Sequence, residues 1–412
     1  MKTYIKLAWY SLKKNPFFSF IILFGISITI MIVMFVGSIL ETGYGSNGIY
    51  KDIDQVLIAP QLKVKRTEGN GWSNSGFSYS AFKDYFSKMK TPEVMSVTMN
   101  HWYTNLYYKD LGLDVQRMSI DNNFTKIFPL QFIIGRPFSF EDLEQRKKLV
   151  IISKYVADNI FGTEDPLNKK IKIQSEYYEV IGVIEDVNKM RRQATADVYT
   201  PLDIYQKENT DWHRFLGNNT MLMKFKDKDS MEAGQDEFQH IISLLPINKE
   251  HNEESMSAKF LTEKAWLFYH MLEIEDEKLF GVYLSLIAFF VMLIPALSLI
   301  NLNITRTSER TAEMGIRKSF GASSLDLLYQ LLMENIFTTL IGGFIGVLLT
   351  FVVIYLFNTY GWIGNNFNLE INFQLLIYGL GCTLFFSLMS GFYPALKISN
   401  FGIISSLKND KQ

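Results

Sequence analysis

The residues NIFTTLIGGFIGVLLTFVVIYLFNTYGWIGNNFNL, positions 335–369, form a run of 35 without a single Asp, Glu, Lys or Arg. A helix needs about 20 apolar residues to cross the hydrocarbon core of a bilayer, so this run is long enough for a transmembrane span. Three further charge-free runs, at 15–40, 279–305 and 371–396, hold 26, 27 and 26 residues. Buried helices of soluble proteins more often show apolar runs of about 10–14 residues. The four runs therefore predict an α-helical membrane domain with four spans.

The segments between these runs complete the plan of the chain. The apolar part of the first run, 17–40, exceeds the 7–15 residues typical of a signal-peptide core, and no small-residue cleavage site follows it. We therefore interpret 17–40 as an uncleaved transmembrane helix. The other expected segments are a cytoplasmic N-terminal amphipathic arm at 1–16, an extracytoplasmic α/β domain at 41–278, transmembrane helices at 279–305, 335–358 and 371–396, a cytoplasmic loop at 306–334, an outer turn at 359–370 and a cytoplasmic tail at 397–412.

Basic residues predict the orientation, because Lys and Arg are enriched on the cytoplasmic side of membrane proteins. The turn at 359–370 has no basic residue, whereas the arm, the loop and the tail all carry them. Their positions are Lys2, Lys6, Lys13, Lys14, Arg306, Arg310, Arg317, Lys318, Lys397, Lys408 and Lys411. Both termini are therefore expected in the cytoplasm of a multi-pass inner-membrane protein surrounded by lipid, with 41–278 on the outside.

The composition of the outer domain excludes some classes of partner. It carries 36 acidic and 30 basic residues, a net charge of about −6, which argues against binding nucleic acid. Cys382 is the only cysteine and lies in the fourth span, so no intramolecular disulfide can form.

The sequence predicts no catalytic, cofactor or metal site. The five histidines stand apart, without metal-ligand spacing, and no catalytic signature occurs. Gly is never followed by Lys, so these residues contain no phosphate-binding loop for a nucleotide. The spans also lack Asp, Glu, Lys, Arg and His, which argues against a carrier coupled to protons or ions.

The outer domain has the pattern of a mixed α/β fold. Short β-branched or alternating runs at 55–59, 94–99 and 220–225 predict strands, whereas apolar residues at helical spacing predict helices at 79–89 and 231–245. The segment between these two strand–helix units, about 111–202, is richer in strand and turn signals. We expect a β-rich subdomain inserted there.

A few residues in the spans indicate how the helices pack. Pro295 removes one backbone hydrogen bond in the second span, so we expect a kink or a packed neighbour there. Gly342 and Gly346 in the third span, and Ser387 and Gly391 in the fourth, place small residues four positions apart. Such pairs allow close approach of helices, either within the four-span bundle or at a subunit interface.

The cytoplasmic loop contains a short predicted helix that ends at a sharp turn. Its sequence from 309 to 322 is ERTAEMGIRKSFGA. Gly321 is suited to a left-handed helix cap, and Ser323 or Ser324 can cap the next helix, with Asp326 in a capping-box position. The helix either lies on lipid headgroups or docks into a groove of another protein, which the pattern favours. The residues assigned to docking are Glu309, Arg310, Glu313, Met314, Gly315, Ile316, Arg317, Lys318 and Gly321, with Met314 and Ile316 as apolar anchors.

Several stretches resemble the FtsX/MacB-like permeases of ABC transporters. In the membrane domain these are LINLNITRTSERTAEMGIRKSFGA from Leu299, QLLMENIFTTLIGGFIG at 330–346 and GFYPALKISNFGIISSL at 391–407. In the outer domain they are DNNFTKIFPLQFIIGRPFSFED at 121–142, FGTEDPLNKKIKI at 161–173 and YEVIGVIEDV at 178–187. The resemblance covers nearly the whole chain and its order of parts, and it matches the outer domain to the MacB-type periplasmic domain.

The resemblance implies a function. Such permeases form dimers, of two copies or with a paralogue, and each copy binds a cytoplasmic ABC ATPase through the loop helix. They transmit ATP-driven motion to the outer domain, some with a periplasmic adaptor and an outer-membrane channel. Members export peptides or drugs, extract lipoproteins or activate cell-wall hydrolases. Some MacB-like chains contain their own ATPase; here 1–16 leaves no room for one, so ATP and Mg²⁺ are expected on a partner chain.

Two other functional classes have requirements that can be compared with the sequence. A membrane-anchored sensor or regulator that acts on a periplasmic partner needs a signalling module inside the cell, where only the loop and the termini are available. A membrane enzyme such as a peptidase needs polar catalytic residues in a span or a recognisable site outside, and the sequence shows neither. The sequence therefore favours a non-catalytic transporter subunit.

Overall fold

The structure is a computed structural model that describes residues 16–45, 48–67, 71–187, 195–203, 214–263, 265–266, 316–317 and 319–360. Isolated positions are described as well, at 10, 13, 279, 282–283, 286, 290, 369, 377, 381, 384–385 and 388. The chain divides into two compact units. One consists of Met1–Thr42 and Lys278–Gln412, here called the helical unit, and the other is Gly43–Glu277, here called the outer unit.

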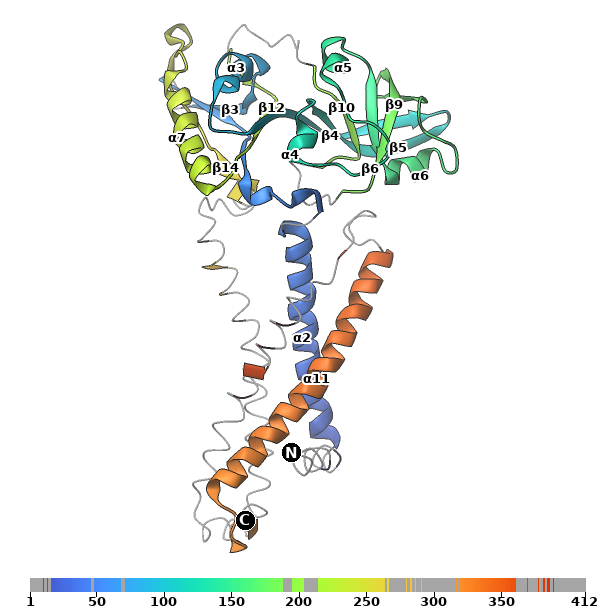
Figure 1. The fold of residues 1–412 in the computed structure, drawn as a ribbon, viewed down its shortest axis with the longest axis vertical. Helices are drawn as coiled ribbons and strands as arrows, with labels where there is room; N and C mark the ends of the chain where they lie inside the picture. Colours follow the sequence, from blue (N-terminus) through green and yellow to red (C-terminus); the bar gives the residue numbers. More distant parts are fainter. Residues whose placement is uncertain are drawn as a thin grey trace. The chain divides into compact units, whose positions relative to one another are not determined.

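Two long helices form the described part of the helical unit (Figure 1). Helix α2 covers Pro16–Tyr44 and begins with a proline, which is favourable at a first helical position because its fixed φ suits the helix. Helix α11 covers Ser324–Tyr360. Within the described residues, the stretches Pro16–Ile39 and Leu325–Tyr360 are long and apolar enough to cross a membrane. The predicted spans at 279–305 and 371–396 lie almost entirely outside the described residues.

Helix α11 begins where the possible caps Ser323 and Ser324 predict a helix start, inside the segment 306–334 that the sequence assigns to the cytoplasmic loop. The helix starts at Ser324 and continues without interruption to Tyr360, through the expected start of the third span at 335. The reason is that neither Asp326 nor Glu334 breaks a helix, and the cap before Ser324 sets its first turn. The charge-free run therefore marks the apolar part of the helix and not its beginning.

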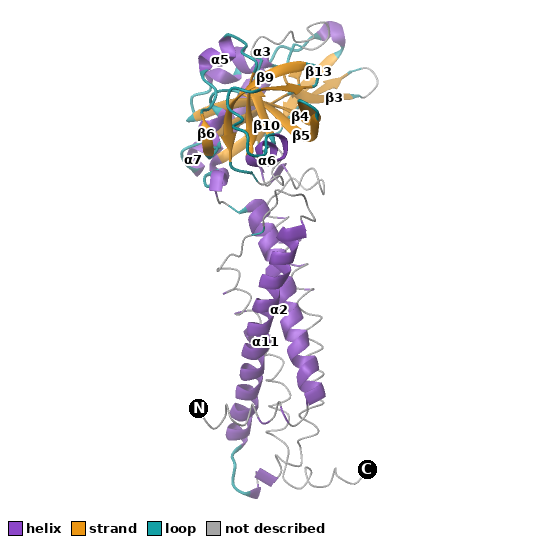
Figure 2. Ribbon diagram, turned by 90° about the vertical axis from the view of Figure 1, so that its right-hand side faces the viewer, coloured by secondary structure: helices purple, strands orange, loops and turns teal. Residues whose placement is uncertain are grey.

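The outer unit is built around an extended sheet with short helices (Figure 2). Its helices are α3 Tyr79–Asp84, α4 Phe124–Ile127, α5 Phe140–Glu144, α6 Lys154–Ile160 and α7 Lys228–Leu244, with 3-10 turns at Gly48–Tyr50, Ile53–Gln55, Phe86–Lys88 and Lys249–His251. Its strands are β1 Val56–Ala59, β2 Leu62–Arg66, β3 Trp72–Phe77, β4 Val94–Tyr108, β5 Leu111–Ile120, β6 Phe132–Gly135, β7 Leu149–Ser153, β8 Lys170–Ile173, β9 Glu176–Ile184, β10 Val198–Pro201, β11 Leu216–Gly217, β12 Asn219–Lys224, β13 Glu253–Ala258 and β14 Leu261–Thr262.

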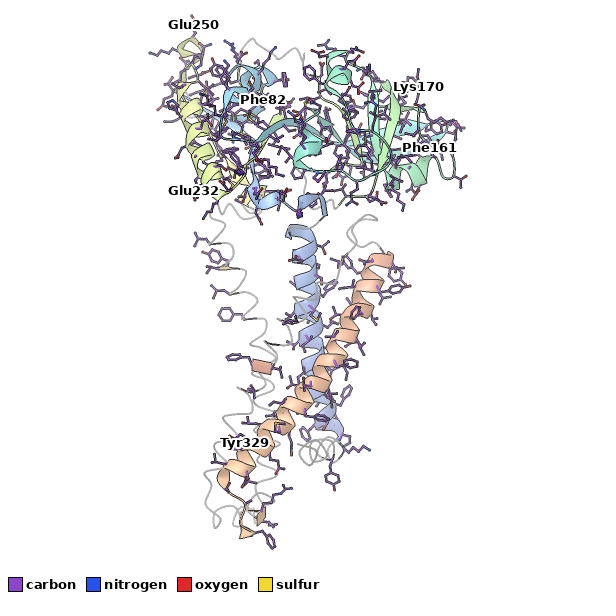
Figure 3. The ribbon with its side chains drawn as sticks, in the orientation of Figure 1. Phe82, Phe161, Lys170, Glu232, Glu250 and Tyr329 are labelled. Carbon is purple, nitrogen blue, oxygen red and sulfur yellow. The ribbon has the colours of Figure 1, made fainter. Side chains whose placement is uncertain are left out.

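Six of these strands close into a ring. The pairings run from β4 to β5, then to β10, β7, β9 and β8, and β8 pairs again with β4. Buried residues that alternate along these strands point inward, among them Val115, Val150 and Val198, and residues of α6 join the same cluster. Phe161 after α6 packs on Tyr108, with ring centroids 4.5 Å apart (Figure 3 labels Phe161).

The rest of the outer unit forms an α/β layer beside this ring. Helices α3 and α7 and the 3-10 turn Phe86–Lys88 pack on β1, β2, β4 and β12, with Phe86 and Phe238 among the buried side chains. A second core on the opposite sheet face joins this layer to the ring, because it combines residues from β1 and β12 with others from β5, β7 and β10. The two parts therefore share both a sheet and a core.

The secondary structure predicted for the outer unit is largely confirmed. Strands occur at all three predicted places, and the predicted helices correspond to α3 and α7. The β-rich part, however, starts before residue 111. Strand β4 pairs with β12 through its first half and with β8 near its end, so it belongs both to the α/β layer and to the ring.

Candidate functional site

A tight corner joins the end of the predicted loop, at Ile316 and Arg317, to α11. Gly321 has φ +94°, in the left-handed region that glycine adopts without steric cost, as the sequence predicted. The amide of Ala322 donates to the carbonyl of Arg317 at 3.0 Å, the six-to-one bond of a Schellman cap. The helical turn that contains Ile316 and Arg317 therefore ends at Phe320.

A capping box starts α11 on the other side of this corner. The amide of Asp326 donates to Oγ of Ser323 at 3.2 Å, and the amide of Ser323 donates to the Asp326 carboxylate at 3.1 Å. These reciprocal bonds satisfy backbone donors at both ends of the first turn, as the spacing of Ser323 and Asp326 predicted. The connection between the two helical segments is therefore held by a backbone–backbone hydrogen bond at the helix end and by two bonds between backbone amides and side chains at the start of α11.

Side chains also cross the corner. Nη1 of Arg317 donates to Oε1 of Gln330 at 2.8 Å, and Nε2 of Gln330 donates to Oε1 of Glu334 at 3.3 Å. Gln330 and Glu334 are both 6% exposed and lie one turn apart on α11. The side-chain amide of Gln330 thus directs its oxygen to the guanidinium of Arg317 and its NH2 group to the carboxylate of Glu334. We call Arg317, Gln330 and Glu334 the corner relay.

The corner also carries large apolar side chains on its surface. Phe320 is 88% exposed and Ile316 49% exposed, and Leu325 and Tyr329 on the first turns of α11 are exposed as well (Figure 3 labels Tyr329). Exposed aromatic side chains beside charged residues are typical of protein contact sites. We call Ile316 and Phe320 the apolar tip of the corner.

The two long helices are in contact through small residues. A Cβ on Gly342 would lie 2.8 Å from Cγ2 of Ile26, and one on Gly346 would lie 2.7 Å from the carbonyl oxygen of Ser27. Oγ of Ser27 donates across the contact to the carbonyl oxygen of Gly342 at 2.9 Å. Further along, the rings of Phe35 and Phe357 meet edge to face with centroids 5.5 Å apart. Gly342 and Gly346 therefore face α2 of the same chain.

The structure brings only part of the sequence-predicted set together. Ile316, Arg317 and Gly321 lie at the corner, and Gly342 and Gly346 lie at the α2–α11 contact. The other predicted residues lie outside the described residues: Glu309, Arg310, Glu313, Met314, Gly315, Lys318, Pro295, Ser387 and Gly391.

Short sequence patterns do not identify several residues of these contacts. Gln330 and Glu334 lie within the predicted loop 306–334, although their spacing of four positions places them on one helix face. Ser27 is one polar residue in an apolar span, and Phe320 lies just before the turn, outside the helical pattern.

The outer unit contains a polar chain on the inner side of the strand ring. His101 and Ser119 are 2.8 Å apart, Ser119 and Thr200 are 3.0 Å apart, and Nε of Arg117 donates to Oγ1 of Thr200 at 3.1 Å. Burial, and after it the charge of Arg117, lower the pKa of His101 to about 4. His101 is therefore neutral at physiological pH. Among the residues described in the structure, no group of three or more His, Cys, Asp or Glu side chains could hold a metal ion.

Two family models match this sequence. The model of the MacB-like periplasmic core domain matches residues 19–241, and the model of the FtsX-like permease C-terminal domain matches residues 285–403. The first match covers more than half of the chain. The second includes the corner and the α11 side of the helix contact.

Characterised proteins align with nearly the whole chain. The macrolide export ATP-binding/permease protein MacB of Campylobacter jejuni is 23% identical over 98% of this chain and 61% of its own length. The protein of the same name from Hahella chejuensis is 25% identical over 98% of this chain and 60% of its own length. The chain thus spans about three fifths of the length of these relatives.

Among solved structures, this chain matches the periplasmic region of MacB from Actinobacillus actinomycetemcomitans. It is 18% identical, with a TM-score of 0.36, and the match covers 52% of this chain and 93% of that structure.

Proposed function

Because this chain belongs to the FtsX/MacB-like family of ABC transporter permeases, a family of membrane proteins with a large extracytoplasmic domain, we propose that it acts by mechanotransmission. ATP hydrolysis in the cytoplasm moves the helical unit, and this movement is passed to the outer unit. The domain order supports the proposal, since α2 leads directly into the outer unit along the chain.

The proposal includes four spans with both termini in the cytoplasm. The four charge-free runs and the distribution of Lys and Arg support this topology, and two of the four helices are long and apolar in the described residues. In this topology the corner between the loop and α11 lies on the cytoplasmic side, where an ATPase can reach it.

The energy source in the proposal is an ABC ATPase on a partner chain. The sequence contains no phosphate-binding loop, so ATP and Mg²⁺ bind outside these 412 residues. The relatives named ATP-binding/permease proteins support an association between this type of permease and an ATP-binding domain. We propose a dimer with a second copy or a paralogue, and an adaptor with an outer-membrane channel as further partners.

The proposed substrate class is a peptide, a lipoprotein or a drug-like molecule that is exported or extracted on the outer side. Export is supported by the names of the aligned relatives. Since the proposal assigns motion and not substrate passage to the spans, it is consistent with the lack of ionisable residues in them.

The observation that carries the proposal is the apolar tip. A phenylalanine that is 88% exposed, on a turn fixed by hydrogen bonds from both sides, has the geometry of an anchor that fits into a partner's groove. The charged residues before it in sequence can steer the encounter. We therefore assign Phe320, together with Ile316, to the contact with the ATPase.

Substitution of Phe320 by Asp tests this assignment. The full chain is co-expressed with a candidate partner ABC ATPase, and the complex is isolated in mild detergent. A carboxylate in an apolar groove should lower the affinity for the ATPase about thirtyfold, as expected for loss of a central anchor. Ser319→Asp is the matched control, because Ser319 is the adjacent exposed residue. Full binding by Phe320→Asp, or equal loss in the control, would contradict the assignment.

A further inference from the structure

The corner relay joins residues that are distant in the sequence but adjacent in the fold. The bond between Arg317 and Gln330 connects positions 13 apart and passes over the turn at Gly321. The relay then continues along α11 to Glu334, whose own carbonyl accepts a bond from Oγ1 of Thr338 at 2.8 Å. Its three side chains therefore fasten the loop end to the first turns of α11.

The chemistry of the relay explains why its middle residue is an amide. A guanidinium offers only donors and a carboxylate only acceptors, so a residue between them must accept on one side and donate on the other. The side chain of Gln330 does both, and the two charges fix its orientation. Hydrogen bonds to charged groups are stronger than neutral ones, and low exposure strengthens them further. The relay is therefore a stiff connection.

The backbone supports the same conclusion. The Schellman cap fixes the end of the loop segment, and the capping box fixes the start of α11, so the chain between Phe320 and Ser324 has little freedom. With the relay closed, the turn from Ile316 to Phe320 and the first turns of α11 form one body. Further along, this body continues to Gly342 and Gly346, where α11 contacts α2.

We propose that Gln330 is a positioning residue that makes the apolar tip and α11 move as one body, so that a displacement of the tip becomes a displacement of the helix. Gln330 does not bind the ATPase; it transmits the movement of the residues that do. This proposal rests on the proposed function, because the displacement comes from the ATPase.

The test replaces Gln330 by Met, which has similar length but forms neither bond of the relay. Thr350→Val is the matched control: Thr350 is also buried on α11, but its Oγ1 bonds only to the carbonyl of Gly346 on the same helix among the described residues, at 2.9 Å. A spin label at Ser319, in a chain with Cys382→Ala, reports the mobility of the loop end. Binding of the co-expressed ATPase and its rate of ATP hydrolysis are measured on the same complexes.

We expect Gln330→Met to bind the ATPase within twofold of the wild type. Stimulation of ATP hydrolysis by the permease should fall about tenfold, as for loss of a hydrogen bond to a charged group, and the Ser319 label should become more mobile. Thr350→Val should leave all three quantities unchanged. Unchanged stimulation in Gln330→Met, loss of ATPase binding in it, or an equal fall in Thr350→Val would overturn the proposal.

The same measurements distinguish failure of the proposed function from failure of the role proposed for Gln330. If the wild-type chain does not bind the ATPase, the proposed function is wrong. The mobility of the Ser319 label then decides by itself whether Gln330 connects the apolar tip rigidly to α11. Greater mobility in Gln330→Met supports this role of the corner relay, and equal mobility refutes it.

Discussion

In the outer unit, the buried carboxylate of Asp142 accepts hydrogen bonds from Arg136, Ser139 and Lys147, all of which lie within six positions of it. In the helical unit, Ser27 on α2 donates to Gly342 on α11, which lies 315 positions later in the chain. The first arrangement forms as soon as a short segment folds. The second exists only when two separate helices meet.

This difference has consequences for how each unit tolerates change. The outer unit has several hydrophobic cores and many paired strands. The loss of one contact there should therefore remove only a small part of its total stability. In the described helical unit, the contact between α2 and α11 depends on a short stretch around Gly342 and Gly346. Without a hydrophobic driving force between helices in lipid, close packing must hold them together. A single bulky residue near Gly342 or Gly346 should therefore lower stability more than the loss of one contact in the outer unit.

The largest effect is expected from Gly346→Leu. Even a Cβ at this position would lie 2.7 Å from the backbone oxygen of Ser27 and 2.9 Å from Cβ of Ile30, so α2 must move. We expect a loss of about 3 kcal/mol or more in the stability of the full chain in mild detergent. The measurement is thermal unfolding followed by intrinsic fluorescence.

The control for this substitution is Gly25→Leu. Gly25 lies on α2, and a Cβ there has nothing within 4 Å. We expect this variant to unfold like the wild type. If both variants lose the same stability, the effect comes from a general intolerance of large residues in α2 and α11, and the contrast between the units is weakened.

A smaller effect is expected from Asp142→Asn in the outer unit. Burial by itself raises the pKa of this carboxyl group, but hydrogen bonds from Arg136, Ser139 and Lys147 lower the pKa well below its usual range. The substitution removes the charge and weakens the capping box at the start of α5. We expect a loss of about 2 kcal/mol, because Arg136 and Lys147 can return to water.

The assay for Asp142→Asn is denaturant unfolding of the fragment 43–277, which forms a compact unit in the structure and is large enough to bury its own core. Glu141→Gln, which changes the neighbouring exposed carboxylate, should stay within about 0.5 kcal/mol of the wild type. Stability of the wild type should also fall as pH drops below about 4, because the carboxylate of Asp142 is ionised in the folded state when it would already be protonated in the unfolded chain. A pH profile below 4 that is the same for wild type and Asp142→Asn would refute this role.

At neutral pH the smallest effect is expected from His101, because its charge changes only in acid. Its folded pKa of about 4 lies below the value of about 6.5 in an unfolded chain, so protons bind preferentially to the unfolded state between these values. The stability that depends on neutral His101 is complete above pH 6.5 and is lost as pH falls toward 4. Removal of this group by His101→Asn should therefore reduce the loss of stability between pH 7 and pH 4 by up to about 3 kcal/mol.

Comparison of wild type and His101→Asn separates the contribution of His101 to the pH dependence of stability from that of a second group, the buried Asp121. Burial raises the pKa of Asp121 to about 6, and this group acts in the opposite direction over nearly the same pH range. Because Asp121 is present in both proteins, its contribution cancels in the difference between the two unfolding profiles. Equal pH profiles for the two proteins would mean that His101 does not titrate in this range.

Much of the local structure was predictable from short patterns. Gly321 and Ser323 identified a helix end and a helix start, because a cap needs particular residues at fixed positions. Apolar spacing located α3 and α7 in the same way. The predicted packing pair Gly342 and Gly346 was visible as a motif, but its partner on α2 was not, since small residues allow contact without specifying with what.

The sequence by itself determined which segments are apolar enough for a membrane, where the outer domain lies in the chain, and the residues that begin and end several helices. Each of these depends on composition or on neighbours a few positions apart. Only the tertiary structure decided that β8 returns to β4 and closes a ring, that Ser27 meets Gly342, and that Gln330 connects Arg317 to Glu334. These contacts join residues whose side chains become neighbours only after the chain has folded, so no local pattern specifies them.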